Sequence, residues 1–444
     1  RINVVRVTPD PGVIEINIHP AQSWKDLKEI TSVLYEEARQ ENLDSSTYQV
    51  DGRPTGSGGG NHIVVGGETP ADSPFLRRPD LLGSIIRYWQ RHPSLSYLFS
   101  GMFIGPTSQA PRIDEARHDS LYEMEIALKE LDRLGEAPQP WLVDRLFRHM
   151  LTDLTGNTHR SEVCIDKMFS PDGPTGRLGL VEFRGFEMPP HWQMSMAQSL
   201  LMRALLAWFW EEPYRAPVKP LGTHLHDRYL LPEYVWEDFQ SVLADLSTAH
   251  GTPFQPDWFR AQLDFRFPLA GEAKFDATHI ELRSAIEPWL VLGEESAAGG
   301  TARFVDSSVE RMQIKLSGFN PERHTACLNG YALPMQHRPD GSFVAGVRYR
   351  SWQPWSALHP TIPAHDPLRF DLFDRLAGRS VGGFTYHSAH PGGRAHETRP
   401  INALEAEGRR LARFVAGGQS PNLREPKHLG VHPDFPLTLD LRRV

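Results

Sequence analysis

Apolar and polar residues alternate along two short stretches of the chain. Within residues 13–19, isoleucines at positions 14, 16 and 18 alternate with polar residues at 15, 17 and 19, including Glu15. Residues 178–184 predict a second strand, in which Glu182 and Arg184 share one side. Both stretches therefore predict strands with one buried face and one polar face.

A spacing of three and four between apolar residues predicts the helices. The first helix follows Ser23, a favourable N-cap residue, and carries apolar residues at positions 24, 27, 30 and 34. Glycine and proline predict loops at 51–60 and 170–176, and residues 61–65 predict a strand. Further helices are predicted over residues 79–91, 115–135, 140–152, 192–210 and 233–249.

The pattern changes near residue 290. Residues 297–300 (Ala-Ala-Gly-Gly) are a candidate linker, and short alternating runs such as 311–316 and 342–349 follow it. Turn sequences such as Pro-Asp-Gly at 339–341 separate these runs. This half predicts an all-β module, a sandwich, with one late helix over 403–415.

Composition narrows the class of protein. The chain has 444 residues, of which 40% are hydrophobic and 23% charged, as in ordinary globular proteins. Its net charge of -8 argues against a nucleic-acid binder, which is normally basic. No apolar run reaches the roughly 18 residues of a membrane helix. We therefore expect a cytoplasmic protein, with Cys164 and Cys327 as buried, reduced thiols.

Carboxylates and a histidine form the candidate metal site. Glu15 and Glu182 lie on polar strand faces, and His62 follows a glycine-rich segment. Carboxylate and imidazole ligands suit Mg²⁺ or Mn²⁺, and glycines let a backbone approach phosphate closely. The alternatives are exposed strand faces for the two glutamates and a hydrogen-bonded turn for the histidine. The segment lacks the Lys-Ser/Thr of a P-loop.

Four arginines are candidates for binding phosphate. Arg184 lies beside Glu182 on the same strand face, where the alternative is a surface ion pair. Arg112 and Arg117 flank an acidic pair, which also fits charge patterning at a helix start. Arg177 has the opposite strand parity to Arg184, so it would reach the site only from a bulge or a loop.

These segments, in this order, resemble the glutamine synthetase superfamily. Residues 12–17 resemble its metal-binding strand, and residues 58–62 resemble its Asn-Gly-x-Gly-x-His segment. Residues 106–112 resemble the stretch ending in a phosphate-binding arginine, and residues 181–184 resemble its Glu-x-Arg strand. More specifically, nearly the whole chain is similar to a bacterial amidoligase family, as seen in residues 61–64, 94–101, 110–118 and 386–393.

The resemblance implies an α+β fold and two domains. Residues 1–292 would form a glutamine synthetase-like catalytic domain, with an antiparallel curved sheet and outer helices. Residues 300–444 would form a β-sandwich-like accessory domain. The superfamily has an earlier strand with further metal-binding carboxylates, and the chain begins at Arg1 rather than Met. We therefore expect this chain to be the C-terminal part of a longer protein with a transglutaminase-like domain upstream. The chain by itself can then lack activity.

The activity implied is ATP-dependent ligation of a carboxylate to an amine through an acyl phosphate. Its substrates would be small molecules or peptides, and a neighbouring subunit of a homo-oligomer would complete the site. The roles implied are metal ligands at Glu15, His62 and Glu182, nucleotide contacts at Gly58, Gly60, Asn61, His62 and Arg177, and phosphoryl stabilisation by Arg112, Arg117 and Arg184. The alternatives are a guanidino-kinase-like phosphotransferase and a non-catalytic module that binds a peptide or a partner.

Overall fold

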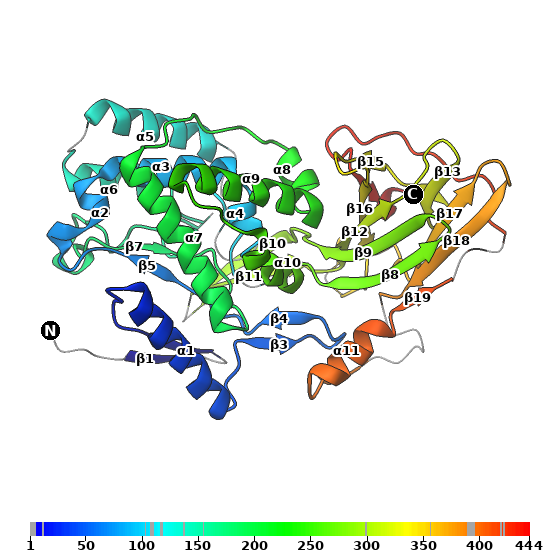
Figure 1. Cartoon of the computed structure of the whole chain (residues 1–444), viewed down its shortest axis with the longest axis horizontal. Coiled ribbons are helices and arrows are strands. Elements are labelled where there is room, and N and C mark those ends of the chain that lie inside the picture. The colour runs from blue at the N-terminus through cyan, green and yellow to red at the C-terminus, as the bar shows by residue number, and fades with distance from the viewer. Residues whose placement is uncertain are drawn as a thin grey trace. The chain divides into compact units, whose positions relative to one another are not determined.

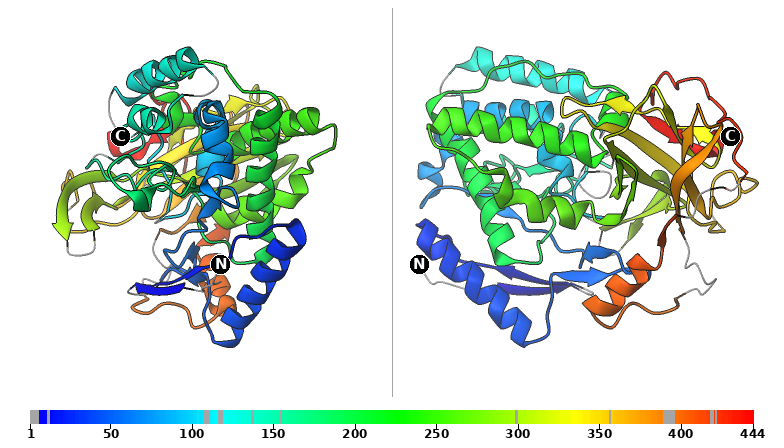
Figure 2. Two further views of the ribbon diagram at one scale, coloured as in Figure 1. Left: turned by 90° about the vertical axis from the view of Figure 1, so that its left-hand side faces the viewer. Right: turned by 45° about the vertical axis from the view of Figure 1, so that its right-hand side comes forward.

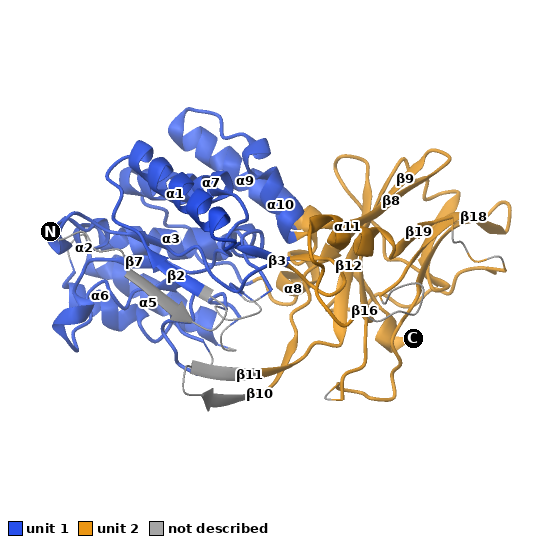
Figure 3. Cartoon of the chain, turned by 90° about the horizontal axis from the view of Figure 1, so that it is seen from below, with its two compact units in different colours: residues 1–47, 55–220, 235–266 blue, residues 48–54, 221–234, 267–444 orange. Residues whose placement is uncertain are grey.

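The computed structural model has a mixed α+β fold with several antiparallel sheets (Figures 1 and 2). It divides into two compact units: unit 1 comprises residues 1–47, 55–220 and 235–266, and unit 2 the remainder (Figure 3). The predicted catalytic boundary near residue 292 stays a prediction, because a unit of packing is not a catalytic domain. The structure describes residues 6–10, 13–102, 104–106, 111–115, 119–135, 138–153, 155–297, 300–355, 357–388, 396–417, 420 and 422–444.

The helices before residue 267 agree well with the pattern of apolar residues. The Ser23 hydroxyl accepts a hydrogen bond from the Asp26 amide at 3.1 Å and caps the first helix as predicted. The helix predicted from residue 115 begins only at Ser120, and the one predicted to residue 152 ends at Phe147. The α-helices are α1 (Trp24–Gln40), α2 (Pro74–Arg77), α3 (Pro79–Arg91), α4 (Ser94–Tyr97), α5 (Ser120–Leu134), α6 (Pro140–Phe147), α7 (Trp192–Glu211), α8 (His224–Arg228), α9 (Pro232–His250) and α10 (Arg260–Arg266), with 3-10 turns η1 (Pro70–Asp72), η2 (Pro174–Gly176) and η3 (Pro256–Phe259).

The strands before residue 267 are short and form three small ladders. They are β1 (Arg6–Asp10) with β2 (Val13–Asn17), β3 (Ser46–Tyr48) with β4 (Pro54–Gly56), and the order β5 (Ile63–Val65), β7 (Val181–Phe183), β6 (Val163–Cys164). The prediction of a buried isoleucine face over residues 13–19 is wrong, because Ile14 is 47% and Ile18 41% exposed. The loop predicted over 51–60 contains β4. A glutamine synthetase-like curved sheet is not established.

Strand β7 joins the third ladder to the core of unit 1. Val181 and Phe183 are fully buried, and the Phe183 ring stacks on Trp89 of α3 with 6.3 Å between centroids. Trp89 also meets Phe186 edge-on at 5.9 Å. Since successive strand residues face opposite ways, Glu182 points to the other face of the ladder.

Unit 2 contains two larger sheets around one apolar core. The first has the order β15-β16-β12-β9-β8, with β20 beside β16, and the second has the order β14-β13-β17-β18-β19. Ile280, Met312 and Ile314 from the first sheet and Phe370 and Phe384 from the second share this core. A β-sandwich-like domain was predicted for residues 300–444, but β8 and β9 of the first sheet lie before that range, and the domain boundary stays a prediction. The elements are β8 (Leu269–Phe275), β9 (Thr278–Ala285), β12 (Val309–Ser317), β13 (His324–Leu328), β14 (Tyr331–Ala332), β15 (Gln336–His337), β16 (Phe343–Arg350), β17 (Leu368–Asp374), β18 (Arg379–Tyr386), α11 (Ala403–Leu411), β19 (Phe414–Ala416), β20 (Thr438–Asp440) and η4 (Leu441–Arg443).

The two ends of the predicted linker at 297–300 lie in paired strands, and its middle residues, 298 and 299, lie outside the described residues. Strands β10 (Leu290–Ala297) and β11 (Gly300–Asp306) form an antiparallel hairpin, in which Ala297 pairs with Gly300. The predicted late helix is confirmed as α11, whose cap Asn402 accepts a hydrogen bond from the Glu405 amide at 2.9 Å.

The two faces of the β5-β7-β6 ladder should respond differently to truncation. We expect Phe183→Ala to lower the free energy of unfolding by about 3–5 kcal/mol, because it leaves a cavity against Trp89. Val64→Ala, at a 49% exposed position in the same ladder, should cost less than about 1 kcal/mol. Urea denaturation of both variants measures this, and equal losses would contradict the assignment of faces.

Candidate functional site

The Glu182 carboxylate is the centre of a charged cluster on the polar face of β7. Arg184 Nη1 lies 2.7 Å and His62 Nδ1 3.1 Å from Glu182 Oε1. Lys167 Nζ lies 3.8 Å from Oε2. Strand alternation brings Arg184 to this face, and the β5-β7 register, in which Val64 faces Glu182, brings His62.

The Glu182 carboxylate is ionised at physiological pH. Burial acts to raise its pKa, but the hydrogen bond from His62 and the charges of Arg184, His62 and Lys167 outweigh burial and lower the pKa to about 2. The side chain is only 9% exposed. An anionic oxygen held in this way can serve as a ligand for a divalent cation.

The glycine-rich segment positions His62. A Cβ atom at Gly60 would lie 2.5 Å from His62 Nε2, so only glycine lets the ring occupy this position. The Asn61 side-chain amide donates to Gln198 Oε1 at 2.6 Å and to Ser195 Oγ at 3.1 Å, both on α7. Gly58 has φ +96°, a left-handed conformation that favours glycine, and open space around it.

Two of the predicted site residues, Glu15 and Arg177, make their contacts outside the Glu182 cluster. Glu15 is exposed on the β1-β2 ladder, where it accepts a hydrogen bond from Asn17 at 3.2 Å. Arg177 donates to the backbone carbonyls of Ser170 and Pro171, both at 3.1 Å. Among the described residues, no hydrogen bond or ion pair joins Glu15 or Arg177 to Glu182, so their roles stay predictions.

Arg112 is bound into the core of unit 1. It is 1% exposed, and its guanidinium donates to the Asp114 carboxylate at 2.8 and 3.1 Å. It also donates to Ser96 Oγ and to the Gln90 carbonyl, both at 2.8 Å. The cavity beside it measures about 30 Å³, room for one water rather than a phosphate group. Its phosphate-binding role stays a prediction, as does that of Arg117, which lies outside the described residues.

The sequence reasoning missed three residues on the polar face of this ladder. Cys164 pairs directly with Glu182 in the β6-β7 register, so both side chains leave the ladder on one side. Burial raises the pKa of the Cys164 thiol to about 12, which argues against a free nucleophile. Asp166 follows Cys164 by two residues, and Lys167 follows it by three. The i, i+2 spacing of Cys164 and Asp166 was the one feature of the sequence that could have indicated that these two side chains lie near each other.

A second glutamate near the glycine-rich segment, Glu187, has a raised pKa, whereas the pKa of Glu182 is lowered. Glu187 is 1% exposed, and neither carboxylate oxygen has a hydrogen-bond partner in the described structure. Cβ atoms at Gly56 and Gly101 would lie 1.5 and 1.1 Å from these oxygens, so the two glycines make room for the carboxylate. Burial raises the pKa of Glu187 to about 7, and the nearby charge of Arg266 only partly opposes it.

The fold and the cluster define a mixed α+β protein with an ionised carboxylate among cationic side chains and a histidine. A family model described as "Putative amidoligase enzyme (DUF2126)" matches residues 1–442. The chain therefore belongs to this amidoligase family, whose description points to formation of amide bonds. Searches of curated proteins and of solved structures gave no significant match. Among the described helices, none is long and apolar enough to cross a membrane.

The buried Glu187 should make stability fall as pH rises. Its pKa is about 7 in the folded state and ordinarily 4.5, so the folded state holds a proton that the unfolded state releases between these values. We expect Glu187→Gln to remove this dependence, which amounts to about 2–3 kcal/mol between pH 5 and pH 8. Unfolding midpoints of the parent and the variant across this range measure it. An unchanged slope in the variant would contradict the raised pKa.

Proposed function

We propose that this chain is an ATP- and divalent-metal-dependent ligase that joins a carboxylate to an amine through an acyl phosphate. The observation that carries the proposal is the Glu182 cluster, which combines an ionised carboxylate, His62 and Arg184 on one polar face. Membership of a family described as amidoligases supports the amide product. The glutamine synthetase-like catalytic fold over residues 1–292 belongs to this proposal.

The Glu182 cluster supplies some, but not all, of the ligands that a hard divalent cation needs. Glu182 and His62 would hold Mg²⁺ or Mn²⁺, whose remaining positions suit water and phosphate oxygens. Glu15 is proposed as a further ligand. When bound, the ion supplies positive charge that screens the phosphates of ATP. The described residues bring one carboxylate and one imidazole together, which is enough to orient an ion but fewer ligands than a full protein cage.

The cationic side chains would handle the transferred phosphoryl group. Arg184 and Lys167 flank Glu182, and Lys167 is half exposed, so its ammonium group can turn towards an incoming anion. Arg112 and Arg117 are proposed as further phosphoryl contacts. Gly58, Gly60, Asn61 and Arg177 are proposed to line the nucleotide. Catalysis here rests on positioning and charge rather than on covalent chemistry by the protein.

The reaction has two balanced steps. A carboxylate oxygen of the substrate attacks the γ-phosphorus of ATP, and the bond to ADP breaks. The amine nitrogen then attacks the acyl carbon, phosphate leaves, and the nitrogen loses a proton. Formation of the acyl phosphate makes phosphate the leaving group, which a free carboxylate lacks. A guanidino kinase would stop after one transfer and release a phosphorylated guanidine.

Nucleotide binding should depend on the Glu182 cluster and on metal. We expect ATP to bind in the presence of Mg²⁺, and Arg184→Ala to weaken binding at least tenfold, because a charge-assisted contact to phosphate is lost. Calorimetric titration with and without Mg²⁺ measures this.

Strand β9 offers a matched control for this experiment. Glu281-Leu282-Arg283 repeats the Glu-x-Arg spacing, with Arg283 Nε 2.9 Å from Glu281 Oε1 in unit 2. Arg283→Ala should leave ATP binding unchanged. Absence of Mg²⁺-dependent binding to the parent chain, or equal losses in both variants, would contradict the proposal.

A further inference from the structure

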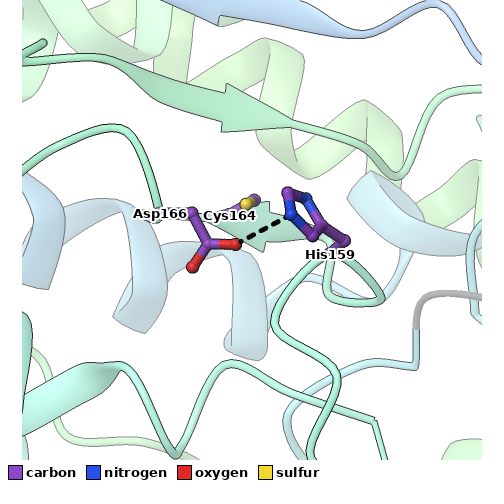
Figure 4. A group of neighbouring side chains, drawn as sticks. All are labelled: His159, Cys164 and Asp166. Atoms are coloured by element: carbon purple, nitrogen blue, oxygen red, sulfur yellow. Dashed lines mark ion pairs between the residues drawn. The ribbon is translucent and has the colours of Figure 1, made fainter. Parts of the chain in front are cut away.

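Three metal-ligating side chains of different chemistry meet at the end of β6. His159, Cys164 and Asp166 each offer one ligand atom, and these atoms all lie within 4.8 Å of one another (Figure 4). Donor atoms around a tetrahedral zinc ion lie roughly 3–4 Å apart, given bonds of about 2.0–2.3 Å. Small side-chain rotations would therefore bring all three onto one ion.

We propose that His159, Cys164 and Asp166 form a binding site for a borderline transition-metal ion such as Zn²⁺. A thiolate, an imidazole and a carboxylate together select Zn²⁺, Fe²⁺ or Co²⁺ over Mg²⁺, which prefers oxygen ligands. Three protein ligands leave a fourth position, and the 58% exposed His159 side chain places that position at the solvent boundary. The site uses none of the residues that the proposed ligase function assigns and does not depend on that function.

Surrounding hydrogen bonds hold the ligands in place. Arg148 Nη1 donates to Asp166 Oδ1 at 3.0 Å, and Thr158 Oγ1 donates to Asp166 Oδ2 at 2.7 Å. Arg148 is itself fixed by the buried Asp144 through contacts of 2.6 and 2.9 Å. Supporting contacts of this kind orient carboxylate ligands in metal sites.

Burial raises the pKa of the Cys164 thiol to about 12, so a bound ion would itself have to displace the thiol proton. Hydrogen bonds within the preceding turn hold the backbone that carries His159. The His159 amide donates to Asn157 Oδ1 at 3.0 Å, and Asp153 Oδ1 accepts from the amides of Thr155 and Asn157 at 2.8 and 3.0 Å. The turn that presents the imidazole is thus set by its own hydrogen bonds.

The competing explanation is a surface ion pair above an ordinary buried cysteine. His159 Nε2 lies 3.3 Å from Asp166 Oδ2, and exposed pairs of this kind are common. The two explanations differ at the sulfur, because an ion pair needs no contribution from Cys164. A spectroscopic signal from a metal–thiolate bond therefore separates them.

Cobalt substitution of the full chain tests the site. The reduced protein, stripped with a chelator, should bind one equivalent of Co²⁺ and develop a thiolate-to-cobalt charge-transfer band that Zn²⁺ then abolishes. Cys164→Ser should lose the band. Cys327→Ser is the matched control, since Cys327 is also buried but donates to the Asp371 carbonyl in unit 2, and it should keep the band.

Two further variants control for misfolding and for metal binding at the neighbouring Glu182 cluster. His159→Ala changes an exposed side chain, so it should lower Co²⁺ affinity at least tenfold without shifting the unfolding midpoint. Glu182→Gln should keep the band, because its carboxylate belongs to the other cluster. The proposal is overturned by absence of a thiolate band in the parent, by its persistence in Cys164→Ser, or by its loss in Glu182→Gln.

Discussion

The alternation of strand β7 is the constraint on which the candidate site depends. Phe183 is buried against Trp89, and this packing fixes the strand's rotation. Glu182 must then emerge on the opposite face, where little water reaches it. A carboxylate in such a place is costly unless cations and donors surround it. Arg184, His62 and Lys167 meet that need, so the hydrophobic side of one short strand determines the polar cluster on its other side.

Glu182 and Glu187 show how local partners decide the charge of a buried carboxylate. Both are largely buried and lie five positions apart, yet the pKa falls to about 2 at Glu182 and rises to about 7 at Glu187. Glu182 has close cationic partners, whereas the Glu187 carboxylate lies between two glycines and has no hydrogen-bond partner among the described residues. Glu182 is therefore the carboxylate suited to binding a cation at neutral pH. Glu187 is suited to holding a proton there.

Local sequence patterns predicted the helices and strands of this protein well, but they predicted the burial and the long-range contacts of these elements less well. Helical spacing located α7, and strand parity placed Glu182 with Arg184, because both are properties of neighbouring residues. Burial depends on what the rest of the chain packs against. The exposure of Ile14 and the pairing of β10 with β11 were therefore missed. Partners brought together by folding were missed for the same reason: the core contacts of Arg112 and the cluster of His159, Cys164 and Asp166.

Trapping the acyl intermediate is the most direct test of the ligase account. The full chain would be incubated with ATP, Mg²⁺, a panel of amino-acid and peptide carboxylates, and hydroxylamine as the amine. The account predicts that at least one carboxylate yields a hydroxamate with an equal amount of ADP. Glu182→Gln should abolish this product, and Glu281→Gln on β9 should not. A phosphorylated guanidine formed from a guanidino substrate, or a hydroxamate yield unchanged in Glu182→Gln, would contradict it.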